Sequence, residues 1–383
     1  MATGTTSRLS GLEFVNPQNA GAGSLVEAFR TIPAGGTTDL PGKPLDLYAD
    51  IAGAGRMFDL DAWNAFTHGT SLLVTQHGRV VHEWYADGLG PADAFLGASM
   101  TKSALAHLVG IAVRSAALGV SDRVVDHVPE LTGSGYTRCT VRDLLTMTTG
   151  VAWVEDHRDP DSPASRLTAC FGGDGGDSRA LLKEIGPRST PGTRYEYCTA
   201  DSQVLDWVRE RATGTTYDVA LGELWSTLGC TSEAYVGTDS VGVSMSGGSL
   251  AATARDWARI GQLQLGGTVD GTPDRRRVLD EDWVEQSTRA SYPFLAPGRL
   301  PSSITTHAGF GYHWWPMDDL GNRVTADGSR GQFAAADRRT GAVVVKTSQW
   351  PYADFLVDRE ARDLSYLGLH ALLAAGSPLP TKE

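Results

Sequence analysis

The sequence has few cysteines, no clustered basic residues and no metal-binding pattern, and each shortage limits what the protein can be. Its four cysteines, Cys139, Cys170, Cys198 and Cys230, lie far apart, so we expect free thiols and no disulfide framework. The nine histidines form no His-x-x-x-His or Cys/His cluster, so we expect no metal and no other cofactor. The net charge of -12 argues against nucleic acid or an anionic membrane as a partner, because phosphate contacts need clustered Lys and Arg.

Long hydrophobic runs are also missing. The most apolar stretch, residues 105–120, is interrupted by Arg114 and is too short to span a bilayer. Residues 1–36 are rich in Gly, Ala, Ser and Thr and have no apolar core behind a basic start, unlike a secretory signal. With 383 residues, of which 41% are hydrophobic and 20% charged, we expect a cytoplasmic globular protein with two subdomains around a shared interface.

Strand-like segments gather near the two ends of the chain. Residues 71–76 and 79–85 are β-rich and flank His77-Gly78, which predicts a hairpin. Four further β-rich runs are at residues 311–315, 322–326, 332–336 and 342–348. These patterns predict one antiparallel sheet assembled from both ends of the chain. Residues 1–65 are expected to form an irregular wrap with at most one helix.

The middle of the chain is expected to be mostly helical. A helix begins near Ser99 and is expected to end at a glycine cap, Gly119. A second follows the capping-box spacing of Thr140 and Asp143 and stops at Gly150. Further amphipathic patterns predict helices before Gly214, over residues 253–265 and over residues 353–375.

A serine and a lysine three residues apart begin the longest amphipathic run. Because Leu105 and later apolar residues follow at helical spacing, Ser99 and Lys102 should share one helix face. A serine hydroxyl becomes a good nucleophile when a neighbour takes its proton, and a buried, neutral lysine can do so. The alternative for this pair taken alone is a helix cap beside a solvated lysine.

Four landmarks in sequence order carry a family resemblance. They are Ser99-Met-Thr-Lys102, the segment 140–150 (Thr-Val-Arg-Asp-Leu-Leu-Thr-Met-Thr-Thr-Gly), Glu-Tyr197-Cys-Thr after Pro-Gly-Thr, and Gly247-Gly-Ser-Leu before Ala-Thr-Ala-Arg-Asp. Together they resemble the class C β-lactamase family of penicillin-recognising serine hydrolases, over about residues 70–360. The resemblance implies an α+β fold, an antiparallel sheet flanked by helices plus a mostly helical domain. We expect residues 1–120 and 246–383 to form the sheet domain and 121–245 the helical domain, with the active site in the cleft between them.

The same resemblance implies a role for each residue of the site. Ser99 would be the nucleophile, Lys102 the base that accepts its proton, and Tyr197 the group that passes the proton to the leaving group. Such a lysine needs a pKa lowered from about 10.4 towards roughly 7. The backbone amides of Ser99 and Ser329 would form the oxyanion hole, and Gly328 would let the substrate lie close to the backbone.

Two motifs depart from the family pattern. The strand-edge Lys-Thr-Gly-Ser-like tetrapeptide is Ala326-Asp327-Gly328-Ser329 here, and the usual Tyr-x-Asn is Tyr197-Cys-Thr199. The missing lysine and asparagine help to hold a β-lactam, so their loss weighs against β-lactamase activity. We therefore expect a serine hydrolase that cleaves small linear amides, and short esters, through an acyl-enzyme. A carboxylesterase of the same fold is the alternative, a D-alanyl-D-alanine peptidase or β-lactamase is less favoured, and a homodimer is allowed.

The segment 153–177 has no periodicity and many acids, and it predicts a long surface loop that borders the cleft. The candidate substrate-binding residues are Glu155, His157, Ser246, Trp315, Gly328 and Trp350. An acidic rim with aromatic walls favours a substrate with an apolar chain and a cationic end. The alternative is that the acids belong only to a solvated loop.

Overall fold

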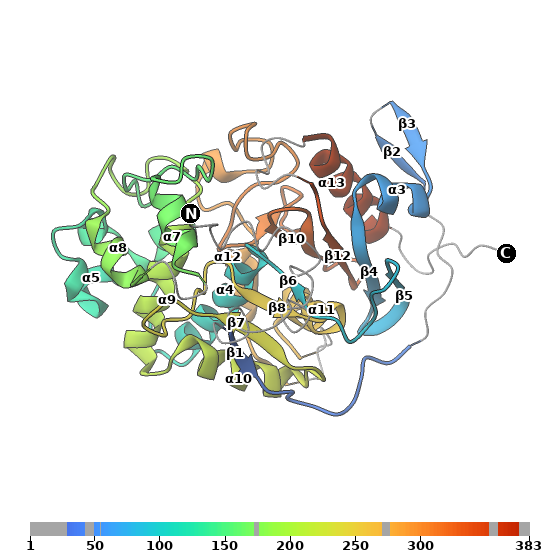
Figure 1. Ribbon diagram of the computed structural model, residues 1–383, viewed down its shortest axis with the longest axis horizontal. Helices are drawn as coiled ribbons and strands as arrows, with labels where there is room; N and C mark the ends of the chain where they lie inside the picture. The colour runs from blue at the N-terminus through green and yellow to red at the C-terminus, as the bar shows by residue number, and fades with distance from the viewer. Residues whose placement is uncertain are drawn as a thin grey trace, which may run out of the picture.

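A six-stranded antiparallel sheet joins the two ends of the chain (Figure 1). The computed structural model describes residues 29–42, 50–53, 55–171, 176–269, 276–351 and 359–374. The strand order is β5-β4-β12-β11-β10-β9. The strands are β4 (Gly69–Gln76), β5 (Arg79–Tyr85), β9 (Trp315–Pro316), β10 (Arg323–Gly328), β11 (Gln332–Asp337) and β12 (Ala342–Ser348). The pairing of β4 with β12 confirms the predicted sheet.

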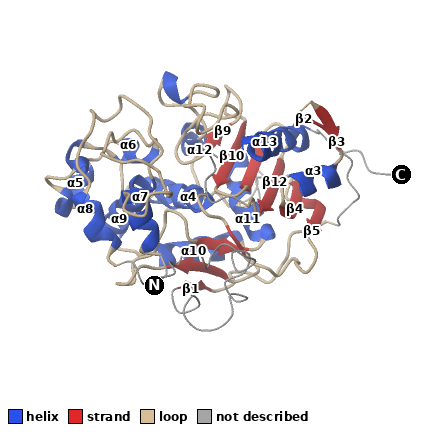
Figure 2. Ribbon diagram, turned by 45° about the horizontal axis from the view of Figure 1, so that its top comes forward, coloured by secondary structure: helices blue, strands red, loops and turns tan. Residues whose placement is uncertain are grey.

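The hairpin between β4 and β5 has the predicted turn. His77 and Gly78 adopt φ values of 47° and 72°, and positive φ at both positions is the requirement of a type I′ turn. Leu73 and Val345 on one face of the central strands join the core around α4 (Met100–Arg114) and α11 (Ala254–Gln262). Leu72 and Val344 on the other face join the core around α3 (Leu60–Phe66) and α13 (Arg359–Ala374). Figure 2 shows α11 and α13 on opposite sides of the sheet.

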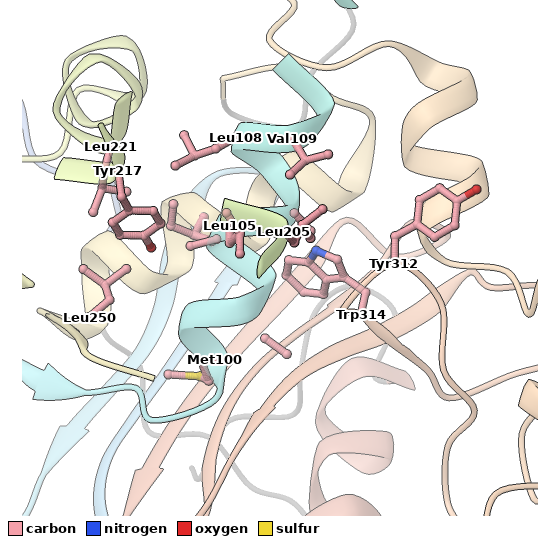
Figure 3. Close-up of a cluster of buried hydrophobic side chains, with 14 of the residues drawn as sticks. Met100, Leu105, Leu108, Val109, Leu205, Tyr217, Leu221, Leu250, Tyr312 and Trp314 are labelled. Atoms are coloured by element: carbon pink, nitrogen blue, oxygen red, sulfur yellow. The ribbon is translucent and has the colours of Figure 1, made fainter. Parts of the chain in front are cut away.

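The helix that follows Ser99 is enclosed almost all round. Figure 3 shows Met100, Leu105 and Leu108 of α4 among side chains from other elements, including Leu205 of α9 (Thr199–Thr213) and Leu221 of α10 (Tyr217–Leu228). The prediction that α4 ends at Gly119 is wrong. It ends at Arg114, and Ala116 takes the left-handed conformation, with φ 58°, that a glycine cap would have supplied.

A second, four-stranded sheet was not predicted. It has the order β1-β7-β8-β6, with β1 (Phe29–Ile32), β6 (Phe95–Leu96), β7 (Ala234–Gly237) and β8 (Leu250–Ala252). Strands of two to four residues are too short to show a period, which is why residues 1–65 read as irregular. A small hairpin, β2 (Ile51–Gly53) and β3 (Arg56–Phe58), lies in the same region. This sheet joins β7, from the expected helical domain, to three strands from the expected sheet domain. The domain boundaries stay a prediction.

The remaining helices lie mostly between residues 120 and 290. They are α5 (Val124–His127), α6 (Val141–Leu145), α7 (Pro163–Ala169), α8 (Ser178–Glu184) and α12 (Glu281–Ser287), with 3-10 turns at Pro129–Leu131, Gly135–Arg138, Leu263–Leu265 and Pro293–Leu295. The capping box of Thr140 and Asp143 is confirmed, but α6 ends at Leu145, before Gly150. The segment expected to be a loop contains α7, whose start is marked by the capping Ser162 and by Pro163 in the first turn. The predicted residues 353–358 of the last helix lie outside the described residues. No helix in the described ranges is long and apolar enough to cross a bilayer.

Candidate active site

Ser99 stands at a tight connection between β6 and α4. The preceding residue, Ala98, has a φ of 46°, a left-handed conformation that costs a non-glycine residue about 1 kcal/mol. Ser99 occupies the N-cap position of α4, yet its side chain makes no capping hydrogen bond. The hydroxyl is held by other groups, which argues against the simple cap alternative.

Lys102 is buried against the serine and is not a solvated lysine. Its side chain lies one turn into α4, the residue is 3% exposed, and Nζ donates to Ser99 Oγ at 2.9 Å and to the carbonyl of Gly247 at 2.5 Å. Burial lowers the pKa of Lys102 to about 8, against the charge of Glu155, which raises it. About a tenth of the amine is therefore neutral at pH 7, far more than for an ordinary lysine.

Tyr197 approaches the same serine from the segment that leads into α9. Lys102 Nζ lies 5.3 Å from the centre of its ring, and its hydroxyl shares a hydrogen bond with Ser99. The ring stacks on Trp315, with centroids 5.9 Å apart. Burial and the charge of Glu155 raise the pKa of Tyr197 well above its ordinary value, so the phenol keeps its proton. The Tyr197 phenol can therefore donate this proton only while it receives another proton from a neighbouring group.

Glu155 is an acidic residue whose charge acts on both Lys102 and Tyr197, and its carboxylate already has four donors. They are Trp153 Nε1 at 2.6 Å, Thr199 N at 3.0 Å, Thr199 Oγ1 at 2.6 Å and His157 Nε2 at 3.2 Å. Burial alone would raise the pKa of Glu155, but the hydrogen bond from His157 and the charge of Lys102 hold it at about 2. A carboxylate offers about four acceptor positions, so Glu155 is saturated by the protein itself.

The other described acids of the segment 153–177 do not line the site. Asp156 pairs with the exposed Arg158, and Asp177 caps α8. Asp159 accepts a hydrogen bond from the backbone of Asp161, and Asp174 lies outside the described residues. Among the described acids of the expected rim, Glu155 alone lies in the cavity lining around Ser99.

Two cavities meet at Ser99. The larger, of about 220 Å³, has apolar walls from Leu96, Leu167, Phe171 and Met245, with Lys102, Gln203 and Arg330 among its polar lining. The smaller, of about 80 Å³, is lined by Tyr197, Ile304, Trp315, Asp327, Trp350 and Arg362. Ser99, Glu155, His157 and Ser329 line both. Groups on the two sides of a scissile bond at Ser99 would therefore have different surroundings.

Five of the six candidate substrate-binding residues line a cavity at Ser99, Ser246 does not, and contacts with substrate stay a prediction. Ser246 is fully buried and its hydroxyl points to Gln203 Oε1 at 3.4 Å, so it lines neither cavity. Gly328 lines the smaller cavity, but the neighbour that requires a glycine is the protein itself. A Cβ there would lie 2.2 Å from the carbonyl oxygen of Gly97 and 3.2 Å from the amide of Met100. The glycine therefore lets the end of β10 touch the start of α4 and brings Ser329 to Ser99.

Sequence reasoning missed Asp327, Arg330 and Arg362 as cavity residues. Asp327 was visible as the residue that replaces threonine in the strand-edge tetrapeptide, and that substitution was the available signal. Arg362 comes from α13, far along the chain, and no local pattern connects it to the site. In the part of the chain that the structure describes, no group of three His, Cys, Asp or Glu side chains is placed to hold a metal ion.

A serine and a buried lysine at the start of a helix, beside the edge of an antiparallel sheet with helices on both faces, define a serine hydrolase of the β-lactamase fold. The chain matches the β-lactamase family over residues 63–367 and belongs to it. It is 31% identical to the 6-aminohexanoate-dimer hydrolase of Paenarthrobacter ureafaciens over 309 residues, which are 79% of this chain and 78% of that protein.

Solved structures show the same fold. A structure from Bacillus anthracis that carries a provisional 6-aminohexanoate-dimer hydrolase name has a TM-score of 0.76 at 19% identity, covering 90% of this chain and 91% of its own. EstCE1, described as a hydrolase with promiscuous acyltransferase activity, has a TM-score of 0.62 at 17% identity, covering 79% of this chain and 93% of its own. A class C β-lactamase has a TM-score of 0.60 at 13% identity, with coverages of 85% and 95%.

Proposed function

We propose that the protein hydrolyses linear amides, of the kind named for its 31% identical relative, and short esters through an acyl-enzyme on Ser99. The observation that carries this proposal is the hydrogen bond from the buried Lys102 Nζ to Ser99 Oγ, at the meeting point of two cavities. A neutral amine at that position can accept the hydroxyl proton as the serine attacks.

The reaction would run in two halves. Ser99 Oγ attacks the carbonyl carbon while its proton moves to Lys102 Nζ, and the amides of Ser99 and Ser329 stabilise the negative oxygen. Tyr197 gives its hydroxyl proton to the leaving nitrogen and receives the proton that Lys102 holds, so the C–N bond breaks and the amine leaves. Water then attacks the ester of Ser99, with the proton again passing through Lys102, and the carboxylic acid and free serine are released.

β-Lactamase and peptidase activities have less support. Ala326 replaces the strand-edge lysine and is buried within β10. Thr199 replaces the asparagine, and both its amide and its hydroxyl are bound to Glu155. Neither position offers a free polar group to the ring carboxylate or amide of a β-lactam. The carboxylesterase alternative needs no change to the site, since an ester leaves with less help from a proton donor.

Parallel assays of 6-aminohexanoate dimer, p-nitrophenyl acetate and nitrocefin test the proposal. We expect turnover of the dimer and the ester, little with nitrocefin, and loss of all turnover in Ser99→Ala with thermal unfolding unchanged. A serine-directed phosphonate should label Ser99 alone. Hydrolysis of the ester without any linear amide would favour the carboxylesterase, and a Ser99→Ala protein that keeps more than a few per cent of its rate would refute the acyl-enzyme.

A further inference from the structure

We propose that His157 holds the water molecule that hydrolyses the acyl-enzyme. Its ring nitrogen Nδ1 accepts one hydrogen of that water while Lys102 accepts the other. The inference rests on the proposed acyl-enzyme at Ser99 and adds a catalytic residue for the second half of the reaction. It leaves the roles of Ser99, Lys102 and Tyr197 unchanged.

His157 lies where the two cavities meet. Ser99, Glu155, His157 and Ser329 line both cavities. In the intermediate Ser99 carries the acyl group, the amide of Ser329 belongs to the oxyanion hole, and the Glu155 carboxylate is filled by its four donors. The side chain of His157 is 36% exposed, so water reaches the ring from the solvent. His157 therefore supplies an imidazole that is open to water and shares its surroundings with the ester on Ser99.

Glu155 fixes both the orientation of this ring and the place of its hydrogen. The pKa of Glu155, about 2, keeps the carboxylate ionised, and an ionised carboxylate only accepts hydrogen bonds. His157 Nε2, 3.2 Å from Glu155 Oε1, must therefore carry a hydrogen, which leaves a lone pair on Nδ1 in the neutral ring. A histidine whose second nitrogen is oriented by a carboxylate is the arrangement that hydrolases use to hold and activate a nucleophile.

The lone pair of Nδ1 lies on the side of the larger cavity. Thr168 Oγ1 of α7 is 3.5 Å from Nδ1, which is longer than an ordinary hydrogen bond. Thr168 lines the larger cavity together with His157, Ser99 and Lys102. A water molecule in this cavity can donate to Nδ1 and accept from Thr168 Oγ1, which gives it two of the two to four polar partners that a bound water has. The volume of about 220 Å³ leaves room for such a water beside an acyl chain.

Lys102 needs a second acceptor for this water. A neutral amine has one lone pair, so Lys102 Nζ takes a single hydrogen of the water and leaves the other without an acceptor. As the water oxygen bonds to the acyl carbon, one proton moves to Lys102 and the other stays on that oxygen, hydrogen-bonded to His157 Nδ1. The bond between the acyl carbon and Ser99 Oγ then breaks, Oγ takes the proton from Lys102, and the product leaves as the carboxylic acid. The step needs no reactant other than water.

The rate constant of deacylation tests the inference in the full-length enzyme. Acetyl-enzyme is formed from p-nitrophenyl acetate and its decay is followed by quenched-flow mass spectrometry, while the release of p-nitrophenol reports acylation. His157→Gln keeps a donor for Glu155 near the position of Nε2 but has no acceptor at the position of Nδ1. We expect deacylation to slow by about ten- to a hundredfold and acylation to change by less than about threefold. Once deacylation limits turnover, kcat and KM should fall together and kcat/KM should stay unchanged.

Two further variants separate the two nitrogens of the ring from a general effect of losing a histidine. His157→Asn places its amide oxygen near the position of Nδ1 and loses the contact with Glu155, so it should deacylate faster than His157→Gln. His127→Gln is the matched control, because His127 Nε2 lies 3.0 Å from Asp122 Oδ2 and His127 lines neither cavity. Both rate constants should be those of the wild type in this control.

Three results would overturn this inference. They are deacylation in His157→Gln within about threefold of the wild type, an equal slowing of acylation and deacylation in that variant, and slower deacylation in His157→Asn than in His157→Gln. The proposed function has a separate criterion, since it fails if the wild type forms no acetyl-enzyme on Ser99 or if Ser99→Ala still hydrolyses the ester.

Discussion

The pH dependence of kcat/KM is the most direct measure of Lys102 as the base. With a pKa of about 8, the neutral amine should be roughly half of the enzyme at pH 8, about a tenth at pH 7 and about a hundredth at pH 6. Because kcat/KM reports the free enzyme, it should rise about tenfold for each pH unit below 8 and level off above it. The assay is the initial rate on a neutral amide at low substrate concentration, in buffers of constant ionic strength.

Glu155→Gln should move this profile. The charge of Glu155 raises the pKa of Lys102, so its removal should lower that pKa and shift the rising limb to lower pH. Asp156→Asn is a matched control, because Asp156 is the neighbouring carboxylate but pairs with Arg158 and lines neither cavity. Lys102→Arg should be nearly inactive, because a guanidinium keeps its proton over this pH range. A limb that stays in place in Glu155→Gln, or an Arg variant within tenfold of wild type, would refute the reasoning.

Three further predictions concern other parts of the structure. Tyr197→Phe should slow amide hydrolysis by on the order of a hundredfold and ester hydrolysis less, and equal losses in parallel assays would contradict the proton transfer. Gly328→Ala should lower kcat and should also lower the free energy of unfolding by about 1 to 3 kcal/mol, because the new Cβ would overlap the Gly97 carbonyl. Denaturant titrations measure the second effect, and Gly90→Ala is the control because the space around Gly90 is open. Lys346→Met should stabilise the protein at pH 7 by on the order of 4 kcal/mol, since burial lowers the pKa of Lys346 from 10.5 to about 7. Between about pH 7 and 10.5, Lys346 is protonated in the unfolded chain and largely neutral in the folded protein, so the stability of the wild type should rise with pH across that range. Chemical denaturation at several pH values should show this rise in the wild type and not in the variant.

Features set by neighbouring residues could be predicted from the sequence. The His77-Gly78 turn, the capping box at Thr140 and the glycine cap at Gly214 depend on a few adjacent side chains and backbone angles, and the structure has all three. The predicted class, an antiparallel sheet flanked by helices, is confirmed by the family match and the solved structures. Helix spacing also predicted that Ser99 and Lys102 share one helix face, and their side chains are hydrogen-bonded. Their catalytic roles stay predictions.

Features that depend on distant segments could not be predicted. β1, β6, β7 and β8 are too short to carry a period, and their pairing is decided by where the chain returns. The charge around Asp327 depends on Arg362 and Tyr366, which α13 brings to the cavity. Ser246 was misplaced because its side chain, which lies in a turn, is directed towards Gln203 of α9, a distant segment of the chain.

The pairing of β4 with β12 has a consequence for the way the enzyme is made. Ser71 and Thr347, hydrogen-bonded across these strands, are 276 positions apart, and closing a flexible loop of that length costs about 5 kcal/mol of chain entropy. Such non-local contacts make folding slow and must wait until β12 has been synthesised. Ser99 emerges from the ribosome well before Ser329 and β12. A nascent chain should therefore stay chemically silent until its last strands join the sheet, and truncation before β12 should leave a serine that no active-site reagent labels.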